Sequence, residues 1–107
     1  MPLTPTMNVS TTLAGNGAIL VLSGRFDFSA HRDFRGAYKA LLDNPEVKEM
    51  LVDFSKVDYM DSSALGMLLL LRQGAEDAGK TVRLRPGEGA VRKVLEIANF
   101  AKIFGFA

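Results

Sequence analysis

The chain has 107 residues, of which 48% are hydrophobic and 23% charged, a composition typical of one globular domain that can bury a core without disulfide or metal staples. It contains no cysteine and one histidine, which excludes disulfides, thiolate metal sites, cysteine nucleophiles and a multi-histidine metal site within one chain. The formal net charge is +1, so no bulk electrostatic attraction to nucleic acid or to anionic membranes is expected.

The N-terminal segment does not resemble a signal peptide. Residues 1–6 have neither a charged region nor an apolar region, and we expect them to form a disordered N-terminus ahead of a single domain at residues 7–107. The longest apolar run, residues 64–71, is far too short to cross a bilayer. The sequence therefore predicts a soluble cytoplasmic protein without membrane insertion.

The chain first predicts a β-hairpin. Residues 9–13 alternate apolar and polar side chains, as in a half-buried strand. Gly-Asn-Gly at residues 15–17 is typical of a hairpin turn. The apolar run at residues 18–22 predicts a second strand that is buried enough to lose the alternation of apolar and polar side chains.

A loop and a helix follow the hairpin. Residues 24–28 predict the loop, and Ser29 is a candidate N-cap. The helix is expected to stop at residues 43–45, where proline follows asparagine. Its apolar face consists of residues at helical spacing, namely Ala30, Phe34, Ala37, Tyr38, Leu41 and Leu42.

The middle of the chain predicts a strand, a loop and a strongly apolar helix. Residues 50–54 form the apolar run of the strand, and residues 55–59 predict the loop. The helix begins at an Asp-Ser-Ser segment, residues 61–63, and runs to about Ala78, with Gly79 placed to end it.

The C-terminal third predicts one more strand and one more helix. Residues 81–85 alternate like a strand near a sheet edge, residues 86–89 form a loop, and residues 90–98 predict a helix that Asn99 can cap. Residues 100–104 suggest a short edge strand. The order β-β-α-β-α-β-α-(β) predicts an α/β fold, with a mixed, mostly parallel sheet of four to five strands and helices packed over it.

The Asp-Ser-Ser segment carries the functional signal. Its acidic residue and two hydroxyls stand where a helix begins, and backbone N–H groups at a helix start lack partners within the helix. A serine there can cap the helix, or it can carry a phosphate that the helix dipole stabilises. The residues alone leave both interpretations open.

In this order of elements, two segments resemble the STAS domain family of bacterial anti-sigma factor antagonists. Residues 61–66, Asp-Ser-Ser-Ala-Leu-Gly, match the family's most specific segment, and residues 24–27, Gly-Arg-Phe-Asp, match its glycine-x-apolar-aspartate loop. The similarity covers nearly the whole chain. It implies a STAS fold and a phosphorylation-controlled binding module rather than an enzyme.

The resemblance implies roles for single residues. Ser62 corresponds to the serine that a partner kinase phosphorylates in the family, and Asp27 is implied as a neighbour of that serine beside Asp61. Ser63 then remains as the expected helix cap. Ala64 stands where the family often has glycine, and alanine favours a helix over glycine by about 1 kcal/mol, so it should stiffen the first turn.

The helix that follows has two interpretations. Gly66 is expected to shape its start, and residues 67–71 are apolar on every face. One interpretation is a helix buried between the sheet and its neighbours. In the other, Met67 or Leu70 lies outside the core as part of a partner-binding patch one turn from Ser62. Both can hold, because these side chains point in different directions.

By resemblance, the unphosphorylated protein binds an anti-sigma serine kinase and frees a sigma factor. The kinase then phosphorylates the serine with ATP, and a serine phosphatase of another chain reverses the modification. The phosphate is expected to prevent docking of the partner and not to unfold the domain. We expect no cofactor and a monomer or weak dimer. The alternative is a structural accessory subunit of a lipid-transport ATPase complex that phosphorylation does not control.

Other polar residues favour simpler interpretations. Asp58 and Asp61 are expected to be loop and cap residues without a third metal ligand, and His31 is expected to be exposed, with nothing placing it beside Ser62 as a base. A local basic cluster predicts a solvated face, with an acidic partner or a nucleotide phosphate as the alternative. The cluster consists of Arg83, Arg85, Arg92 and Lys93.

Overall fold

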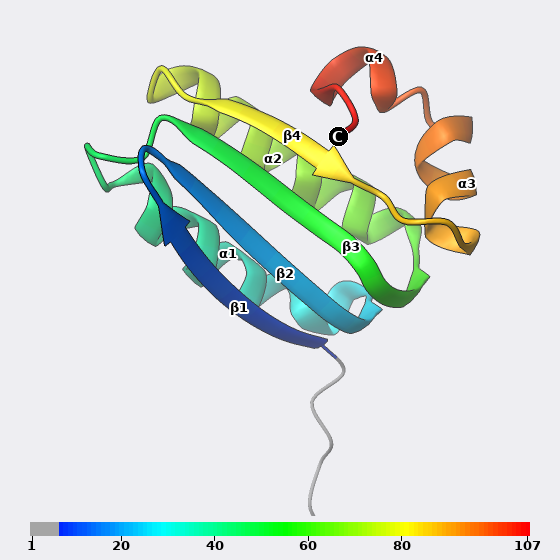
Figure 1. The fold of residues 1–107 in the computed structure, drawn as a ribbon. Coiled ribbons are helices and arrows are strands. Elements are labelled where there is room, and N and C mark those ends of the chain that lie inside the picture. Colours follow the sequence, from blue (N-terminus) through cyan, green and yellow to red (C-terminus); the bar gives the residue numbers. More distant parts are fainter. Residues whose placement is uncertain (1–6) are drawn as a thin grey trace, which may run out of the picture.

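The computed structural model describes residues 7–107, so the predicted disordered N-terminus at residues 1–6 lies outside the described residues. Strands and helices alternate along the chain (Figure 1). The elements are β1 (Met7–Ala14), β2 (Gly17–Phe26), the 3-10 helix η1 (Phe28–Ala30), α1 (His31–Leu42), β3 (Glu49–Met60), α2 (Ser62–Asp77), β4 (Thr81–Arg85), α3 (Ala90–Ile97) and α4 (Ala101–Phe104).

The strands form one sheet in the order β1-β2-β3-β4. β1 pairs antiparallel with β2, whereas β2–β3 and β3–β4 are parallel. Helices α1 and α2 lie behind the sheet and leave most of its opposite face open (Figure 1). The predicted mixed, mostly parallel α/β architecture is confirmed, with four strands in the part of the chain that is described.

The core lies between the sheet and these two helices. Alternate residues of β2, namely Ala18, Leu20 and Leu22, are buried, while the residues between them are partly exposed. Leu68 and Leu71 of α2 are fully buried against the sheet. Burying a leucine side chain contributes about 1.5–3 kcal/mol to the stability of the fold. The buried side chains of β2 and α2 therefore hold α2 against the sheet and determine which face of the helix points outward.

Two segments predicted as loops are strand. Residues 24–26 belong to β2 and residues 55–59 to β3, where Gly24 pairs with Val57 and Phe26 with Met60. The pairing between β2 and β3 shifts register twice along this stretch. Such bulges break the alternation of buried and exposed side chains, which is why the sequence pattern was typical of a loop.

The predicted edge strand at residues 100–104 is wrong, because this segment enters α4. Phe100 and Phe104 are both buried, with ring centroids 5.4 Å apart, and a spacing of four residues brings two rings together only on a helix. The chain then reaches the edge of β4, where Leu84 N donates to Gly105 O at 3.0 Å and Ala107 N donates to Leu84 O at 2.7 Å.

Candidate functional site

The carboxylate of Asp61 caps α2. Its backbone is extended, with φ −112° and ψ −178°, and its Oδ1 accepts from Ala64 N at 3.2 Å and from Ser63 Oγ at 2.6 Å. The expectation that Ser63 caps this helix is therefore wrong. A carboxylate is the stronger acceptor, and Ser63 serves as a donor that holds it in place. Ser62 is the first residue of the helix and is exposed.

Asp27 builds a similar turn at the end of β2. It caps η1, and its Oδ1 accepts from Ser29 N at 3.0 Å and from Ser29 Oγ at 2.5 Å. The predicted Ser29 cap is therefore wrong for the same reason as at Ser63: α1 begins two residues later, at His31, and the aspartate makes the cap. The Ser29 hydroxyl, its N–H and the nearby Arg25 together outweigh desolvation and hold the pKa of Asp27 below its usual value.

The two turns stand side by side at the carboxyl end of the sheet. Phe26 and Met60 are paired, and Asp61 N donates to Phe26 O at 3.3 Å. Asp27 and Asp61 therefore follow paired residues on adjacent parallel strands. Both turns read Asp-x-Ser-Ala, at residues 27–30 and 61–64.

In each turn the variable residue is exposed. It is Ser62 in the second turn and Phe28, at 75% exposure, in the first. Phe28 stacks on His31 with ring centroids 6.4 Å apart, and His31 is partly buried rather than exposed as predicted. Sequence reasoning missed Phe28, although the repeated Asp-x-Ser-Ala pattern was available as a signal.

Arg25 and Tyr59 form a further contact next to the first turn. The guanidinium of Arg25 lies 4.1 Å from the centroid of the Tyr59 ring, and its Nε lies 3.6 Å from Asp27 Oδ2. Arg25 and Tyr59 are register partners in β2 and β3. The contact links the strand end that carries Asp27 to the strand that leads to Asp61.

The outward face of α2 continues from Ser62. Ser62, Gly66 and Leu69 are exposed and lie on one helical face at spacings of four and three residues. Leu69 is 44% exposed and the adjacent Leu70 is 57% exposed, while Met67 is only 5% exposed. Met67 therefore belongs to the core and not to a surface patch. Ala64 is also fully buried, so this departure from the family's glycine faces inward.

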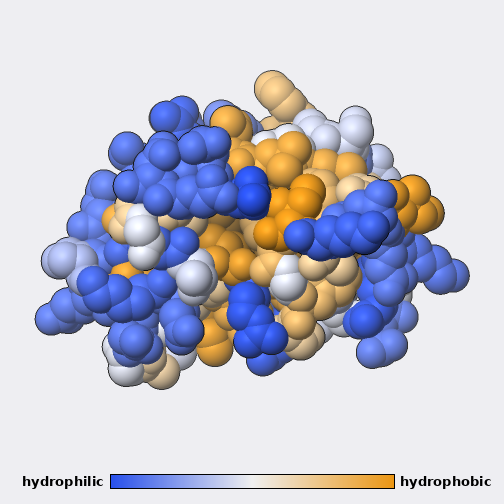
Figure 2. Space-filling model, turned by 90° about the horizontal axis from the view of Figure 1, so that it is seen from above, coloured by the Kyte–Doolittle hydropathy of each residue, from blue (hydrophilic) through white to orange (hydrophobic). Residues whose placement is uncertain are grey.

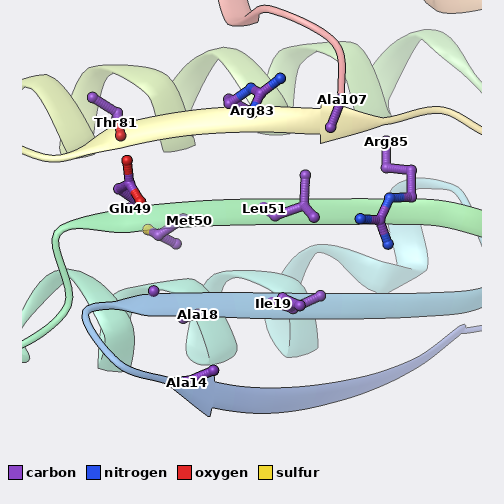
Figure 3. Close-up of a pocket in the computed structure, with 11 residues that line it drawn as sticks. Ala14, Ala18, Ile19, Glu49, Met50, Leu51, Thr81, Arg83, Arg85 and Ala107 are labelled. Carbon is purple, nitrogen blue, oxygen red and sulfur yellow. The ribbon is translucent and has the colours of Figure 1, made fainter.

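Two hollows lie away from the Asp-Ser-Ser turn. One, of about 270 Å³, is on the open face of the sheet, where Ile19 and Leu51 form its floor and Arg83 stands at its rim (Figure 3). It sits at the amino ends of β3 and β4, opposite the end that carries Ser62. The second, of about 220 Å³, lies between α2, β4 and α4 and includes Ile103. Figure 2 shows the molecule from above relative to Figure 1. On this side, exposed apolar side chains form a group that is flanked by hydrophilic side chains.

The predicted basic cluster is exposed at Arg83, Arg85 and Lys93, as expected of a solvated face. Its arginines also bond within the protein. Arg85 Nη1 lies 3.3 Å from Asp53 Oδ2, and Arg83 Nη2 donates to Phe106 O at 3.2 Å. Arg92 donates to Gly87 O at 3.1 Å and to Glu96 Oε2 at 3.3 Å. These partners neutralise or orient the guanidinium groups.

Within residues 7–107, no group of three or more His, Asp or Glu side chains is placed to hold a metal ion. None of the helices in the same range is long and apolar enough to span a membrane.

Comparison with known proteins identifies the fold. The family model described as "Mlab, STAS domain" matches residues 9–105. A STAS-domain-containing protein of Pseudomonas aeruginosa (strain UCBPP-PA14) is 43% identical over 90 residues, which cover 84% of this chain and 87% of that protein.

Solved structures share the same architecture. An anti-sigma factor antagonist from Mycobacterium paratuberculosis superposes with a TM-score of 0.80 at 18% identity, covering 96% of this chain and 87% of that one. The anti-sigma factor antagonist SpoIIAA in its unphosphorylated form gives 0.76 at 20% identity, covering 94% and 88%. Bacillus SpoIIAA in its phosphorylated form gives 0.71 at 19% identity, covering 94% and 91%. From the family match and the curated relative, we conclude that the chain belongs to the STAS domain family.

Proposed function

We propose that this STAS domain is a phosphorylation-controlled anti-sigma factor antagonist, a cytoplasmic binding module and not an enzyme. Unphosphorylated, it binds an anti-sigma factor that is a serine kinase, and phosphorylation of Ser62 releases that partner. The observation that carries the proposal is the exposed Ser62 at the start of α2, where Asp61 makes the cap and Ser63 holds Asp61 in place. Ser62 is therefore accessible to a kinase without loss of the capping hydrogen bonds.

A phosphate at Ser62 is compatible with the folded domain. It adds about −1.5 to −2 charges beside Asp61. The positive end of the α2 dipole offsets part of the repulsion, by about 0.3–1 kcal/mol at an exposed terminus. SpoIIAA has been solved both with and without phosphorylation, which supports a modification that this fold tolerates.

The same phosphate would oppose docking on the surrounding surface. That surface combines the exposed aromatic ring of Phe28 with Leu69 and Leu70 on the outward side of α2. Exposed apolar side chains that are grouped on a surface can mark a binding site for a protein partner. A partner that covers them must also remove water from the phosphate dianion, and that cost has no compensation unless the partner supplies cations.

The test requires the cognate kinase, which should copurify with the protein from its native cell. We expect wild type and Ser63→Ala to be phosphorylated by this kinase with ATP, and Ser62→Ala to remain unmodified. Ser62→Asp should lose partner binding while its unfolding free energy stays within about 1 kcal/mol of wild type. If Ser62→Ala is still fully modified, or Ser62→Asp binds as well as wild type, the proposed switch is wrong.

Phe28 provides a separate test of the docking surface. Phe28→Ala should weaken kinase binding by about tenfold or more, as expected for an aromatic interface anchor. Ile97→Ala on α3 is the matched control, because Ile97 is 83% exposed and lies on a different helix. Equal effects of the two substitutions would argue against a surface centred on the Asp27 and Asp61 turns.

The cognate serine phosphatase should restore binding after phosphorylation. A stable complex with a lipid-transport ATPase that is indifferent to the charge at residue 62 would instead support the alternative function as an accessory subunit.

A further inference from the structure

The two edges of the sheet differ in how they are protected. Beyond β4, residues 105–107 bond to Leu84 on both its N–H and its C=O. β1 is the opposite edge (Figure 1), and no other element of residues 7–107 pairs with its outer side. An unpaired edge presents a row of N–H and C=O groups that can accept another strand.

β1 also lacks the features that usually keep an edge strand from pairing. Its eight residues, MNVSTTLA, include no charged side chain and no proline. Its pairing with β2 runs without a register shift from Met7 to Ala14, so no bulge twists the edge away. Thr11 and Thr12 are β-branched, which favours extended backbone. The strand is therefore regular and uncharged, and within residues 7–107 nothing pairs with its outer side.

A protruding side chain and a hollow lie on the same side of this edge. Leu13 is 57% exposed near the end of β1. A hollow of about 450 Å³ separates the beginning of β1 from α1. The small residues Gly36 and Ala37 line it beside Val9, and the charged Arg32 and Asp33 of α1 line it as well. Leu13 and Val9 are four residues apart, and side chains at even separations in a strand point to the same face. The leucine cannot fill the hollow of its own chain, because it lies further along the strand.

We propose that two copies of this chain associate through antiparallel pairing of their β1 strands about a twofold axis at Thr11. In that register Val9 lies opposite Leu13 of the second copy, and Thr12 lies opposite Ser10. Each Leu13 then enters the hollow beside Gly36 and Ala37 of the other copy. The interface is the same patch on both subunits, as twofold symmetry requires, and it joins the two four-stranded sheets edge to edge.

The charge and geometry of β1 fit a second copy of the same strand as its partner. When a strand pairs with a copy of itself, each side chain lies opposite the same residue or a nearby residue of the copy. A strand without charged residues therefore places no like charges opposite each other across the interface. Met7 pairs with Gly24 near the end of the sheet that carries Asp27, so antiparallel pairing sends the two Ser62 sites to opposite ends of the dimer. Dimerisation therefore leaves both serines accessible, and the inference does not depend on phosphorylation.

A charge-swap experiment on the full chain tests the interface. By sedimentation, wild type should shift from monomer to dimer as its concentration rises. Thr11→Lys places two ammonium groups opposite each other and should raise the dissociation constant by about tenfold or more. Thr11→Glu should behave likewise, and an equimolar mixture of the two should regain the dimer. Thr81→Lys, an exposed substitution at the opposite edge, should leave association unchanged.

Cross-linking tests the register, because the natural chain has no cysteine. Thr11→Cys should give a disulfide-linked dimer on mild oxidation, and Thr81→Cys should not. Thermal unfolding of each variant verifies that the monomer is folded. A wild type that stays monomeric at millimolar concentration, a dimer that Thr11→Lys does not weaken, or equal cross-linking of both cysteine variants would overturn the proposal.

Discussion

At the scale of single residues, the site is built on two aspartates that each close a turn. Asp61 accepts from Ala64 N and Ser63 Oγ, and Asp27 accepts from both polar groups of Ser29. These bonds give the residues of the Asp-Ser-Ser segment different roles. Asp61 and Ser63 maintain the helix start, so Ser62 can change its chemistry without removing a cap.

The assignment of the cap to Asp61 predicts an order of stabilities. Asp61→Ala should lower the free energy of unfolding by about 1 kcal/mol, within the range of about 0.5–2 kcal/mol that is typical of lost N-caps. Asp61→Asn should be nearly neutral, because asparagine is an equally good cap. Ser63→Ala should cost less than Asp61→Ala, since the carboxylate remains. Urea unfolding measures all three, and a larger loss for Ser63→Ala would contradict the assignment.

Lys80 has a structural role far from this site. Its side chain is buried, and its ammonium donates to Asn44 O at 2.8 Å and to Val47 O. The bonds tie the turn after α1 to the start of β4. Lys80→Met should lower the unfolding free energy by about 1–3 kcal/mol, because it leaves two carbonyl groups without their charged donor. Lys102→Met, on the exposed surface, should change it by less than about 0.5 kcal/mol. Equal effects in urea unfolding would argue against this role for Lys80.

At the scale of elements, α2 connects the site to the core, and its two glycines lie in different surroundings. A Cβ at Gly66 would have no atom within 4 Å, whereas a Cβ at Gly74 would lie 2.8 Å from Leu42 Cδ1 of α1. Gly66 is on the outward face that continues from Ser62. Gly74 is where the helix approaches α1.

Alanine should therefore affect the two positions differently. Gly66→Ala should stabilise the domain by about 0.5–1 kcal/mol, because alanine has the higher helix propensity. Gly74→Ala should gain less or lose stability, since the Leu42 side chain must move. Chemical denaturation of both variants measures the difference. If Gly66→Ala also weakens kinase binding while raising stability, the result would locate the partner on this face of α2, and equal stabilisation at both positions would contradict the packing argument.

Elements with regular apolar spacing could be predicted from the sequence. The hairpin turn agrees with its pattern, and so does the end of α1 at Leu42, just before the predicted stop at residues 43–45. α2 also agrees, with Gly79 beyond its end, and Gly79 has the positive φ of 72° that such an end requires. Residues 55–59 could not be predicted as strand, because bulges bring two consecutive exposed residues into one strand. The apolar segment at residues 100–104 has only five residues, which is too few to distinguish a strand from a single helical turn by its pattern.

The site could be predicted only in part, for a similar reason. Asp61 and Ser63 are both good capping residues, and only the backbone conformation decides between them. Ser62 as the phosphorylated residue and Asp27 as its functional neighbour remain predictions. The burial of Met67 could not be deduced, because leucine and methionine cover every face of that stretch of α2. The register between Phe26 and Met60, which aligns the two turns, depends on the bulges.

At the scale of the whole molecule, acidic groups couple stability to pH. Asp53 is buried, which by itself would raise its pKa, but the N–H and hydroxyl of Ser55 and the guanidinium of Arg85 outweigh burial and hold the pKa below its usual value. The bonds to Asp53 Oδ1 from Ser55 N and to Oδ2 from Arg85 measure 2.9 and 3.3 Å. The pKa of Asp27 is also lowered, chiefly by the Ser29 hydroxyl.

A carboxyl whose folded pKa is lowered binds its proton more readily in the unfolded chain. Its contribution to stability is therefore complete above the unfolded pKa of about 3.8 and is lost as pH falls through the lower folded value. We expect the free energy of urea unfolding to stay nearly level from about pH 7 to 5 and to decline below about pH 4. Asp53→Asn should have a lower free energy of unfolding than wild type at neutral pH. The difference between the two free energies should become smaller in acid, because wild-type Asp53 then also loses its charge. Asp58→Asn, at an exposed position, is the control. A gap for Asp53→Asn that stays constant down to pH 3 would mean that its cost comes from altered packing between β3 and β4 and not from the lost carboxylate charge.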